Sequence, residues 1–427
     1  MHSFDITMKN LSKMEGHADL DVKVRDGKAE DVRFKITDSQ RFYEQAVRNQ
    51  SVSAAPQLMA RICGTCSNAH LICSIEAIEK ALGIVPSEQA LMMKKLTMYG
   101  LMIRDHALHL YFFSLPDLIG KDSILDFDEK NEKEHKLLHD AFDVKRAGNL
   151  LSTLVAGKAV HAPFPTIGGF LKTPDKTAVK NTIEELRRVR PSVIDLVDIF
   201  HRWHERFDRD TDHVALVTKD FSFLEGEIRS SNNLCVKEKD YMDHLVNIVI
   251  PYSQSRSFEF EGEDYLVGAI SRVNLNKSAL HKETKKSAAK YLKAFPSNNV
   301  FHNNLAQAIE ILHSIDHSIE ILESSDFVKE ELQKAPSNKG TGVGVIEAPR
   351  GTLYNKFVIA NNKIKNATVV VPTSQNQINI ENDIAKLVED RIKDMRREEI
   401  EYEIEKLIRA YDPCMSCATH FLRVRWL

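Results

Sequence analysis

Two pairs of cysteines near opposite ends of the chain constrain its fold more than any other feature. Cys63 and Cys66 form the first C-x-x-C pair, and Cys414 and Cys417 form the second. Two intervening residues allow both thiolates of a pair to turn toward one ion, and four sulfurs together favour soft or borderline metals: zinc, iron, nickel or copper(I). The fold that uses all four cysteines must bring the two ends of the chain together.

The chain has six cysteines in 427 residues, too few for a disulfide scaffold. In a reducing compartment, C-x-x-C pairs bind metal or carry out redox chemistry more often than they form structural bridges. Spacing alone supports a structural zinc site about as well as a catalytic metal, although a separation of about 350 residues is much wider than in zinc ribbons or fingers. We expect the remaining two cysteines, Cys73 and Cys235, to be small buried apolar residues.

The charge and hydropathy of the chain exclude several classes of protein. Lys and Arg number 58 against 61 Asp and Glu, and the net charge of −3 provides no basic field for a nucleic acid. No apolar run approaches the roughly 18 to 20 residues of a membrane span, and the first ten residues lack the apolar core of a signal peptide. We therefore expect a cytoplasmic protein that neither spans a membrane nor binds nucleic acid.

Hydrophobic periodicity divides the first half of the chain into a β segment and helices. Alternating apolar residues on both sides of Asp26-Gly27 predict a hairpin over 17–37. From about 40 to 210 apolar residues recur at helical spacing, with a break marked by Pro and Gly over 163–169. Residues 91–115 are apolar on most of their circumference, which predicts a buried helix.

The second half of the chain is more varied. Residues 211–275 show a mixed pattern, and 277–335 again has helical spacing, interrupted near Pro296. Short β-branched alternations punctuated by turn residues predict a β meander near 341–373. Beyond it, the charged and amphipathic stretch 378–410 predicts one long helix that leads to the second cysteine pair.

Together these patterns predict an α+β, predominantly α fold with a large helical core, an N-terminal β-hairpin and a small β meander. No internal repeat and no Gly-, Ser- or Pro-rich linker marks a boundary, so we expect a single domain over 1–427. Its parts in chain order are a β segment 1–50, a mainly helical core 51–340, the meander 341–376, a C-terminal helix with the metal motif 377–420, and a tail 421–427.

The sequence around the cysteines resembles that of the large, catalytic subunit of nickel-iron hydrogenases. The first pair lies in R-I-C-G-T-C-S-N-A-H (61–70) and the second in D-P-C-M-S-C-A-T-H (412–420). Further segments similar to family motifs occur in the family's order: K-M-E-G-H (13–17), R-F-Y-E (41–44), D-H-A-L-H (105–109), A-P-R-G (348–351) and V-P-T-S-Q-N (371–376). Lys13 stands where the family usually has arginine, and roughly 120–340 carries no matching motif.

This resemblance implies the nickel-iron hydrogenase large-subunit fold and an oxidoreductase of EC class 1.12, which splits H2 reversibly and heterolytically. The metal centre would be a nickel held by Cys63, Cys66, Cys414 and Cys417. Cys66 and Cys417 would also bridge to an iron that carries carbon monoxide and cyanide. A metal's charge keeps such thiolates deprotonated.

The resemblance also implies roles for residues around the metals. Glu15 is the candidate proton relay beside a terminal thiolate such as that of Cys414. Arg350 would lie above the iron, flanked by the carboxylates of Asp105 and Asp412. His70 would donate a hydrogen bond to the bridging sulfur of Cys66.

A second metal site is implied by the same family. It holds magnesium or a similar divalent ion, with an acidic side chain, the last histidine of the motif, a backbone carbonyl and waters as ligands. In this chain the side-chain ligands would be Glu44 and His420, and the carbonyl would come from near Gln377.

The family further implies partners. All four paired cysteines are assigned to nickel and iron, so electrons would leave through a small subunit with iron-sulfur clusters, and further subunits would bind NAD(P) or a flavin. The length and motif variants resemble the soluble cytoplasmic NAD(P)-linked or coenzyme F420-type group. Residues 421–427 correspond to an extension that a maturation endopeptidase removes; the alternative is that Leu427 is the mature terminus.

Two other functions compete with this interpretation. The related subunit of respiratory complex I has lost the cysteine ligands, whereas all four are present here. A zinc-stabilised scaffold without activity is the second alternative, and metal analysis separates it from an enzyme. No G-x-G-x-x-G or P-loop occurs in a strand-turn-helix setting, so nucleotide binding by this chain is not indicated.

Overall fold

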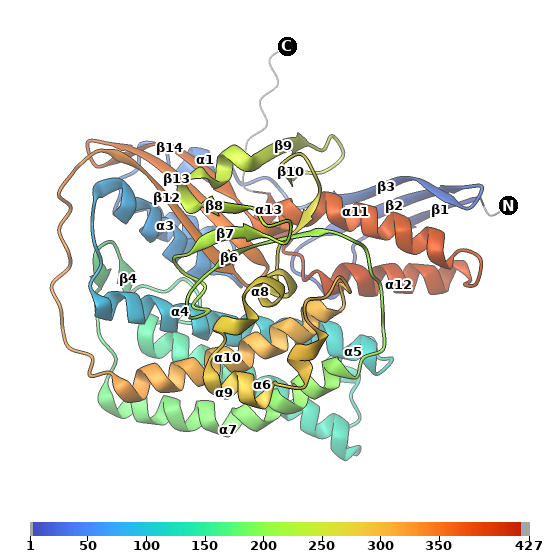
Figure 1. Cartoon of the computed structure of the whole chain (residues 1–427), viewed down its shortest axis with the longest axis horizontal. Helices are drawn as coiled ribbons and strands as arrows, with labels where there is room; N and C mark the ends of the chain where they lie inside the picture. The colour runs from blue at the N-terminus through green and yellow to red at the C-terminus, as the bar shows by residue number, and fades with distance from the viewer. Residues whose placement is uncertain (1–2, 420–427) are drawn as a thin grey trace, which may run out of the picture.

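A computed structural model describes residues 3–419 and begins with a three-stranded antiparallel sheet (Figure 1). Its order is β1 (Phe4–Met8), β2 (Ala18–Arg25) and β3 (Lys28–Ile36). Asp26 and Gly27 both have positive φ, as a tight two-residue hairpin turn requires, so the predicted hairpin is confirmed. Strand β1 was not predicted, because it is short and its pairing with β2 is non-local.

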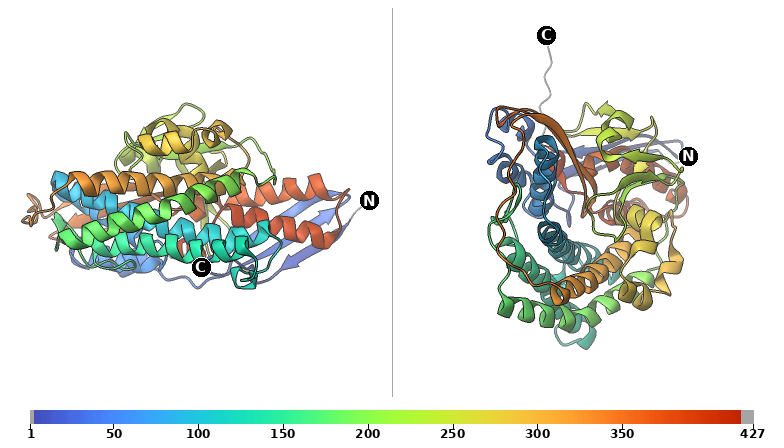
Figure 2. Two further views of the ribbon diagram at one scale, coloured as in Figure 1. Left: turned by 90° about the horizontal axis from the view of Figure 1, so that it is seen from below. Right: turned by 60° about the vertical axis from the view of Figure 1, so that its left-hand side comes forward.

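Long helices form the body of the molecule, which is about 48% helical. They pack beside one another in Figure 2: α3 (Ser67–Leu82), α4 (Glu88–Ala107), α6 (Glu132–Ala156), α7 (Lys176–His201) and α10 (His302–Ser324). The predicted buried helix over 91–115 is α4, which continues into the π-helical η2 (Leu108–Ser114). A Cβ on Gly148 of α6 would lie 2.6 Å from the backbone nitrogen of Arg104 in α4. Glycine therefore permits the close approach of these two helices.

Short helices connect the long ones. Single-turn or slightly longer α-helices are α1 (Tyr43–Ala46), α2 (Ala55–Met59), α5 (Leu115–Leu118), α8 (Ala269–Asn276) and α9 (Lys282–Ser287). The 3-10 turns are η1 (Ala60–Ile62), η3 (Ile124–Asp126), η4 (Glu238–His244), η5 (Lys277–Ala279) and η6 (Tyr291–Ala294). Within residues 3–419, no helix has the length and apolar character needed to cross a bilayer.

The segment expected to be mainly helical, 51–340, also contains strands. A small hairpin joins β4 (Pro165–Thr166) and β5 (Gly169–Phe170) at the predicted break. Further on, one sheet has the order β11-β6-β7-β8, and β9 pairs with β10. Their bounds are β6 (Asp212–Val217), β7 (Glu227–Ser230), β8 (Cys235–Lys237), β9 (Leu245–Val249), β10 (Arg256–Phe260) and β11 (Tyr265–Leu266). Such short strands carry too few alternations to be recognised from sequence.

The predicted meander is confirmed as β12 (Gly340–Ala348), β13 (Gly351–Ala360) and β14 (Lys363–Val370). Helix α3 lies directly on this sheet, because Gly342 and Gly344 leave room for its backbone. A Cβ on Gly344 would lie 2.4 Å from the carbonyl oxygen of Cys73. This contact places the helix that follows Cys66 against the strands that flank Arg350.

Two predicted helix boundaries are wrong. The single helix expected over 378–410 is two antiparallel helices, α11 (Pro372–Arg391) and α12 (Arg397–Ala410), followed by α13 (Met415–Ala418) (Figure 1). The Glu399 carboxylate accepts the backbone N–H of Arg396 at 2.8 Å and so caps a new helix. The helix expected to reach 335 ends at Ser324, and Gln333 instead donates a backbone hydrogen bond of 2.9 Å to Gly168.

Candidate metal centre

The four paired cysteines come from three places in the fold. Cys63 follows η1 with an extended backbone, and Cys66 is the N-cap residue of α3. Cys414 is the N-cap residue of α13, and Cys417 lies inside that short helix. The N-terminal segment joins them, because the carbonyl of Glu15 accepts the backbone N–H of Met415 at 3.0 Å.

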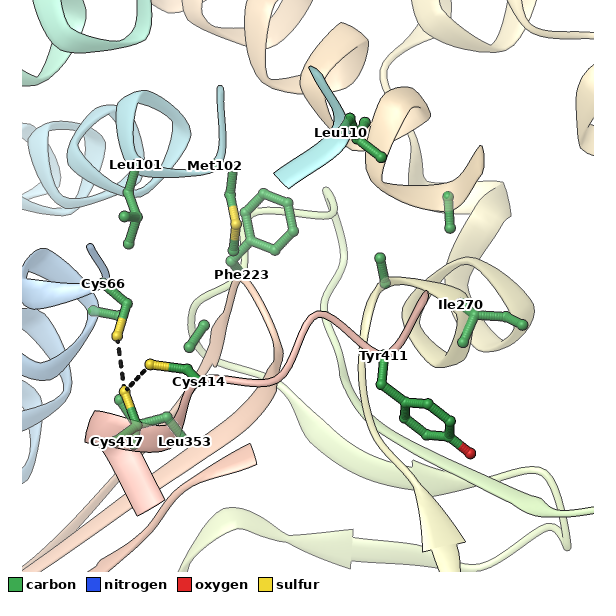
Figure 3. Close-up of a cluster of buried hydrophobic side chains, with 14 of the residues drawn as sticks. Cys66, Leu101, Met102, Leu110, Phe223, Ile270, Leu353, Tyr411, Cys414 and Cys417 are labelled. Atoms are coloured by element: carbon green, nitrogen blue, oxygen red, sulfur yellow. Dashed lines mark hydrogen bonds between the residues drawn. The ribbon is translucent and has the colours of Figure 1, made fainter. Parts of the chain in front are cut away.

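All four sulfurs meet in one buried cluster, as the two motifs predict. Their Sγ atoms all lie within 4.8 Å of one another. Figure 3 shows the contacts of Cys417 with Cys66, at 3.2 Å, and with Cys414, at 3.0 Å. The sulfurs of Cys63 and Cys414 are 3.5 Å apart. Each residue is at most 4% exposed and none is in a disulfide. The cluster is therefore a set of four buried cysteines that form no disulfide.

Burial opposes the charged form of most of these thiols. It raises the pKa of Cys414 and of Cys417 well above the ordinary thiol value. Hydrogen bonds from Cys414 and Cys417 instead lower the pKa of Cys63. A bound cation would deprotonate all four groups and relieve the cost of burying their charge.

Glu15 lies against the cluster, where the sequence analysis predicted it. Its Oε2 atom is 3.0 Å from the Sγ atom of Cys414 and accepts the backbone N–H of Ser416 at 3.1 Å. The Ser416 hydroxyl donates to Oε1 at 2.5 Å. Glu15 is only partly buried, so its carboxyl group connects a buried sulfur with the outer part of the molecule.

Arg350 is clamped between the two predicted carboxylates. Its guanidinium donates to Asp105 Oδ2 at 3.1 Å and to Asp412 Oδ1 at 2.9 Å, and all three residues are buried. Burial works against the charged guanidinium, but the charges of Asp105 and Asp412 outweigh it and hold the pKa of Arg350 above its usual range. Gln307, in the segment without a matching motif, donates to the other oxygen of Asp412 at 3.0 Å.

His70 differs from the prediction in its partner. Its Nε2 atom lies 3.5 Å from the Sγ atom of Cys417, whereas we expected a hydrogen bond to Cys66. Cys66 and Cys417 are each the second cysteine of their pair. His70 lies one turn after Cys66 on α3, and from there its ring reaches across to the sulfur of the opposite motif.

The side chain of Glu44 on α1 is mostly buried, and its Oε1 atom accepts from Arg256 at 3.1 Å and from the backbone N–H of Val369 at 2.8 Å. Nearby, the backbone N–H of Arg41 donates to the carbonyl of Thr419 at 2.9 Å. The predictions for His420 and for the tail 421–427 fall outside the described residues. Gln377 is fully buried and its amide donates to Phe34 O at 2.9 Å, but its Oε1 atom has no partner among residues 3–419.

The two unpaired cysteines differ from each other. Cys73 is fully buried in α3 and donates to the carbonyl of Gly344 at 3.3 Å, as a small core residue would. Cys235 is exposed on β8, so the prediction that it is buried is wrong. It lies on a short strand with its sulfur 3.4 Å from Glu227 Oε2.

Sequence reasoning missed Arg104, which immediately precedes Asp105 on α4. Arg104 is buried, donates to the carbonyl of Thr65 at 2.6 Å, and has no carboxylate within salt-bridge distance among the described residues. Burial lowers its pKa, and the nearby charges of Asp105, Cys66 and Cys63 oppose that shift. An arginine inside an otherwise apolar helical stretch is the signal that could have drawn attention to it.

The residues present fit a bound anionic metal group on two counts. Four thiols offer the ligands that soft or borderline metals prefer. Around them, the Nε atoms of Arg104 and Arg350 and Oδ1 of Asp105 are buried without a hydrogen-bond partner in the described part of the chain. Polar atoms left in this way cost free energy, which a group bound among them would offset.

Comparisons with known proteins agree with this geometry. The family model described as nickel-dependent hydrogenase matches residues 41–140 and 236–420. Sulfhydrogenase 1 subunit alpha of Pyrococcus furiosus is 28% identical over 425 residues, which cover 98% of each chain. The NAD-reducing hydrogenase HoxS subunit beta of Cupriavidus necator is 29% identical and covers 96% of this chain and 94% of its own length.

Solved structures show the same fold. A chain of an NAD+-reducing [NiFe]-hydrogenase in the H2-reduced state superposes with a TM-score of 0.88 at 24% identity, covering 98% of this chain and 99% of its own. The Ni-Fe-Se hydrogenase of D. vulgaris Hildenborough has a TM-score of 0.80 at 19% identity. The family match covers both cysteine motifs and most of the chain, so this protein belongs to the nickel-dependent hydrogenases, as a catalytic large subunit and an oxidoreductase acting on H2.

Proposed function

We propose that the four cysteines hold a nickel-iron centre in which Cys66 and Cys417 bridge the two metals. The observation that carries this proposal is the cluster of four buried cysteines whose sulfurs all lie within 4.8 Å of one another. The resemblance assigns the bridging role to Cys66 and Cys417, the second cysteine of each pair, whose sulfurs lie 3.2 Å apart, and Cys63 and Cys414 would bind nickel alone. When bound, such a centre, with carbon monoxide and cyanide on iron, supplies the heterolytic cleavage of H2.

Glu15 is the group proposed to carry the proton away. The Sγ atom of Cys414 is 3.0 Å from Glu15 Oε2, so a proton on this sulfur can pass directly to the carboxyl group. The thiol S–H bond breaks, an O–H bond forms on the carboxyl group, and the proton leaves outward because Glu15 is only partly buried. The N–H and hydroxyl of Ser416 hold both carboxyl oxygens in place during this exchange.

Arg350 is proposed to hold the cyanide side of the centre. Its planar donors are pinned by Asp105 and Asp412, and its Nε atom has no partner among the described residues. A fixed, always-charged guanidinium stabilises negative charge on the ligands without having to reorganise. His70, beside Cys417 Sγ, would donate to a bridging thiolate in the same way.

A magnesium or similar ion bound by Glu44 and His420 completes the proposed metal sites. Glu44, three residues after Arg41 in the chain, is mostly buried and contacts β14 through the backbone N–H of Val369. Arg41 in turn binds Thr419, the residue before His420. The third protein ligand would be a backbone carbonyl from near Gln377, a residue that is fully buried.

The electrons require a partner, which we propose to be a small subunit with iron-sulfur clusters. Of the six cysteines, four form the metal cluster, Cys73 is buried among carbonyls, and Cys235 stands alone on β8. They leave no set for a second cluster. Further subunits that bind NAD(P) or a flavin would accept the electrons, in a complex located in the cytoplasm and matured by an endopeptidase that removes 421–427.

Metal analysis of protein purified from its native host tests the proposal. We expect nickel and iron in equal amounts, infrared bands of carbon monoxide and cyanide, and a mass that corresponds to a chain ending at His420. Zinc as the only metal would contradict the nickel-iron centre. Active protein that retains Leu427 would contradict the processing step alone.

A further inference from the structure

A second buried ion cluster lies behind the turn that carries Arg350. It consists of Arg272 on α8, Glu310 on α10, Glu347 on β12 and His106 on α4. All four residues are at most 2% exposed. Except for His106, these residues lie outside every motif that the sequence analysis recognised.

Every N–H of the Arg272 guanidinium has an acceptor. Its Nε and Nη2 atoms donate to the two oxygens of Glu310 at 2.6 and 2.7 Å, and Nη1 donates to Glu347 Oε2 at 2.8 Å. The remaining two donors bind backbone carbonyls, those of Ala348 and Pro349, at 2.9 Å each. Arg272 therefore grips the two residues immediately before Arg350.

The carboxylates of this cluster are themselves fixed. Glu347 Oε1 accepts from the Leu216 backbone at 2.7 Å and from the Thr352 hydroxyl at 2.7 Å. Glu310 Oε2 lies 2.9 Å from Nε2 of His106, the residue after Asp105. The cluster thus contacts both the turn that carries Arg350 and the helical turn that carries one of the two carboxylates clamping it.

We propose that Arg272, held by Glu310 and Glu347, is a positioning residue for the hydrogenase reaction. It fixes the backbone of the 348–351 turn, so that the Arg350 guanidinium points at one place over the metal centre. The inference rests on the proposed role of Arg350. A planar fork with five donors is needed, because an ammonium group presents three donors from one atom and cannot reach two carboxylates and two carbonyls together.

Arg272→Lys keeps the charge but loses the fork. We expect nickel and iron content to match the wild type while the cyanide infrared bands shift beyond repeat error. Turnover should fall about 10- to 100-fold, the range that a small misplacement of a catalytic group produces. Arg190→Lys is the matched control: Arg190 binds Asp316, also on α10, with bonds of 2.6 and 3.0 Å, but does not contact the Arg350 turn.

A double-variant cycle with Arg350→Lys separates positioning from a merely structural role. If Arg272 acts through Arg350, adding Arg272→Lys to Arg350→Lys should cost less than about twofold further turnover. The inference would be overturned if the turnover losses of the two single variants multiply in the double variant and Arg272→Lys alone leaves the cyanide infrared bands unmoved. Wild-type protein without carbon monoxide and cyanide bands would instead overturn the proposed nickel-iron centre.

If the Arg272→Lys protein does not incorporate metal, the Glu347→Gln variant can be used for the same experiment. The amide oxygen can still accept from Leu216 and Thr352, whereas its nitrogen no longer accepts from Arg272. A band shift together with a loss that is non-additive with Arg350→Lys supports positioning. Unshifted bands with multiplying losses refute it.

Discussion

The two cysteine pairs contribute equally to the sulfur cluster but are held by different means. Cys66 caps α3, a helix of 16 residues that is buried along almost its whole length. Cys414 is the N-cap residue of α13, which has four residues, and Cys417 lies within it. Contacts with distant parts of the chain hold α13. Glu15 lies against Cys414, and the Thr373 hydroxyl accepts the backbone N–H of Cys414. Arg41 donates to the carbonyls of Ser416 and Thr419.

This difference shows which half of the site has no long helix of its own to support it. The first pair leads into a long helix that lies on the sheet, although Arg41 and Arg104 also donate to the carbonyls of Ile62 and Thr65 in its loop, both at 2.6 Å. The second pair follows Asp412, whose φ of 52° is unusual for a residue other than glycine, and it reaches its position only when the N-terminal segment and α11 are in place. Arg350 binds Asp412, which immediately precedes the second motif's Pro-Cys, and also Asp105 on α4, and it thereby connects the second pair to the helical core.

Removing a ligand should have the largest effect, and the same effect in both pairs. We expect Cys63→Ser, Cys66→Ser, Cys414→Ser and Cys417→Ser each to abolish stable nickel incorporation, because a soft metal loses a thiolate in a closed, buried site. Nickel content of the purified protein measures this. Cys235→Ser is the control and should load normally, since Cys235 is exposed and outside the cluster. A pair that tolerates serine would show that the halves are not equivalent as ligands.

Glu15→Gln tests the contact particular to the second pair. The amide keeps the shape of the side chain but cannot take up a proton, so turnover should fall by about 10² or more while nickel and iron are retained. Turnover under saturating H2, normalised to nickel content, is the measurement. Near-normal turnover would remove Glu15 from the proton path and leave it as a support for Ser416.

Arg350→Lys tests the group that joins the two halves. A lysine ammonium cannot reproduce the two-sided grip on Asp105 and Asp412, so we expect metal to be incorporated and turnover to fall about 10-fold or more. The infrared bands of the metal ligands should shift as well. Unchanged bands and turnover would show that the guanidinium does not act on the centre.

The smallest predicted effect compares the supports of the two pairs directly. Thr373→Val strands the buried N–H of Cys414 and should lower the free energy of unfolding by about 1–3 kcal/mol. Thr65→Val removes only a half-exposed hydroxyl 3.3 Å from the sulfur of Cys63 and should cost less than about 1 kcal/mol. Urea unfolding of the metal-free proteins measures both. Equal losses would contradict the proposed dependence of the second pair on distant contacts.

Much of the architecture was predictable where its signal is local. The Asp26-Gly27 turn, the buried helix α4 and the meander up to Val370 all carry periodicity or turn residues that act over a few positions. The strands between 212 and 266 were not predicted individually, because two to six residues of alternation do not outweigh their mixed surroundings. The break at 392–396 was missed because charged helix-forming residues run through it, and packing of α12 against α11 decides where the chain reverses.

The sequence by itself determined the ligand set and the family, because C-x-x-C spacing and the flanking motifs are properties of short segments. Through the resemblance that these motifs carry, it also predicted Glu15, Arg350, Asp105 and Asp412 as residues of the site. Only the tertiary structure decided that His70 reaches Cys417, that Arg104 is buried beside the thiols, and that Arg272 grips the turn before Arg350. The physical reason is that these contacts join separate elements of the fold, two of them through backbone carbonyls, and that burying a polar group favours an arrangement in which it finds a partner.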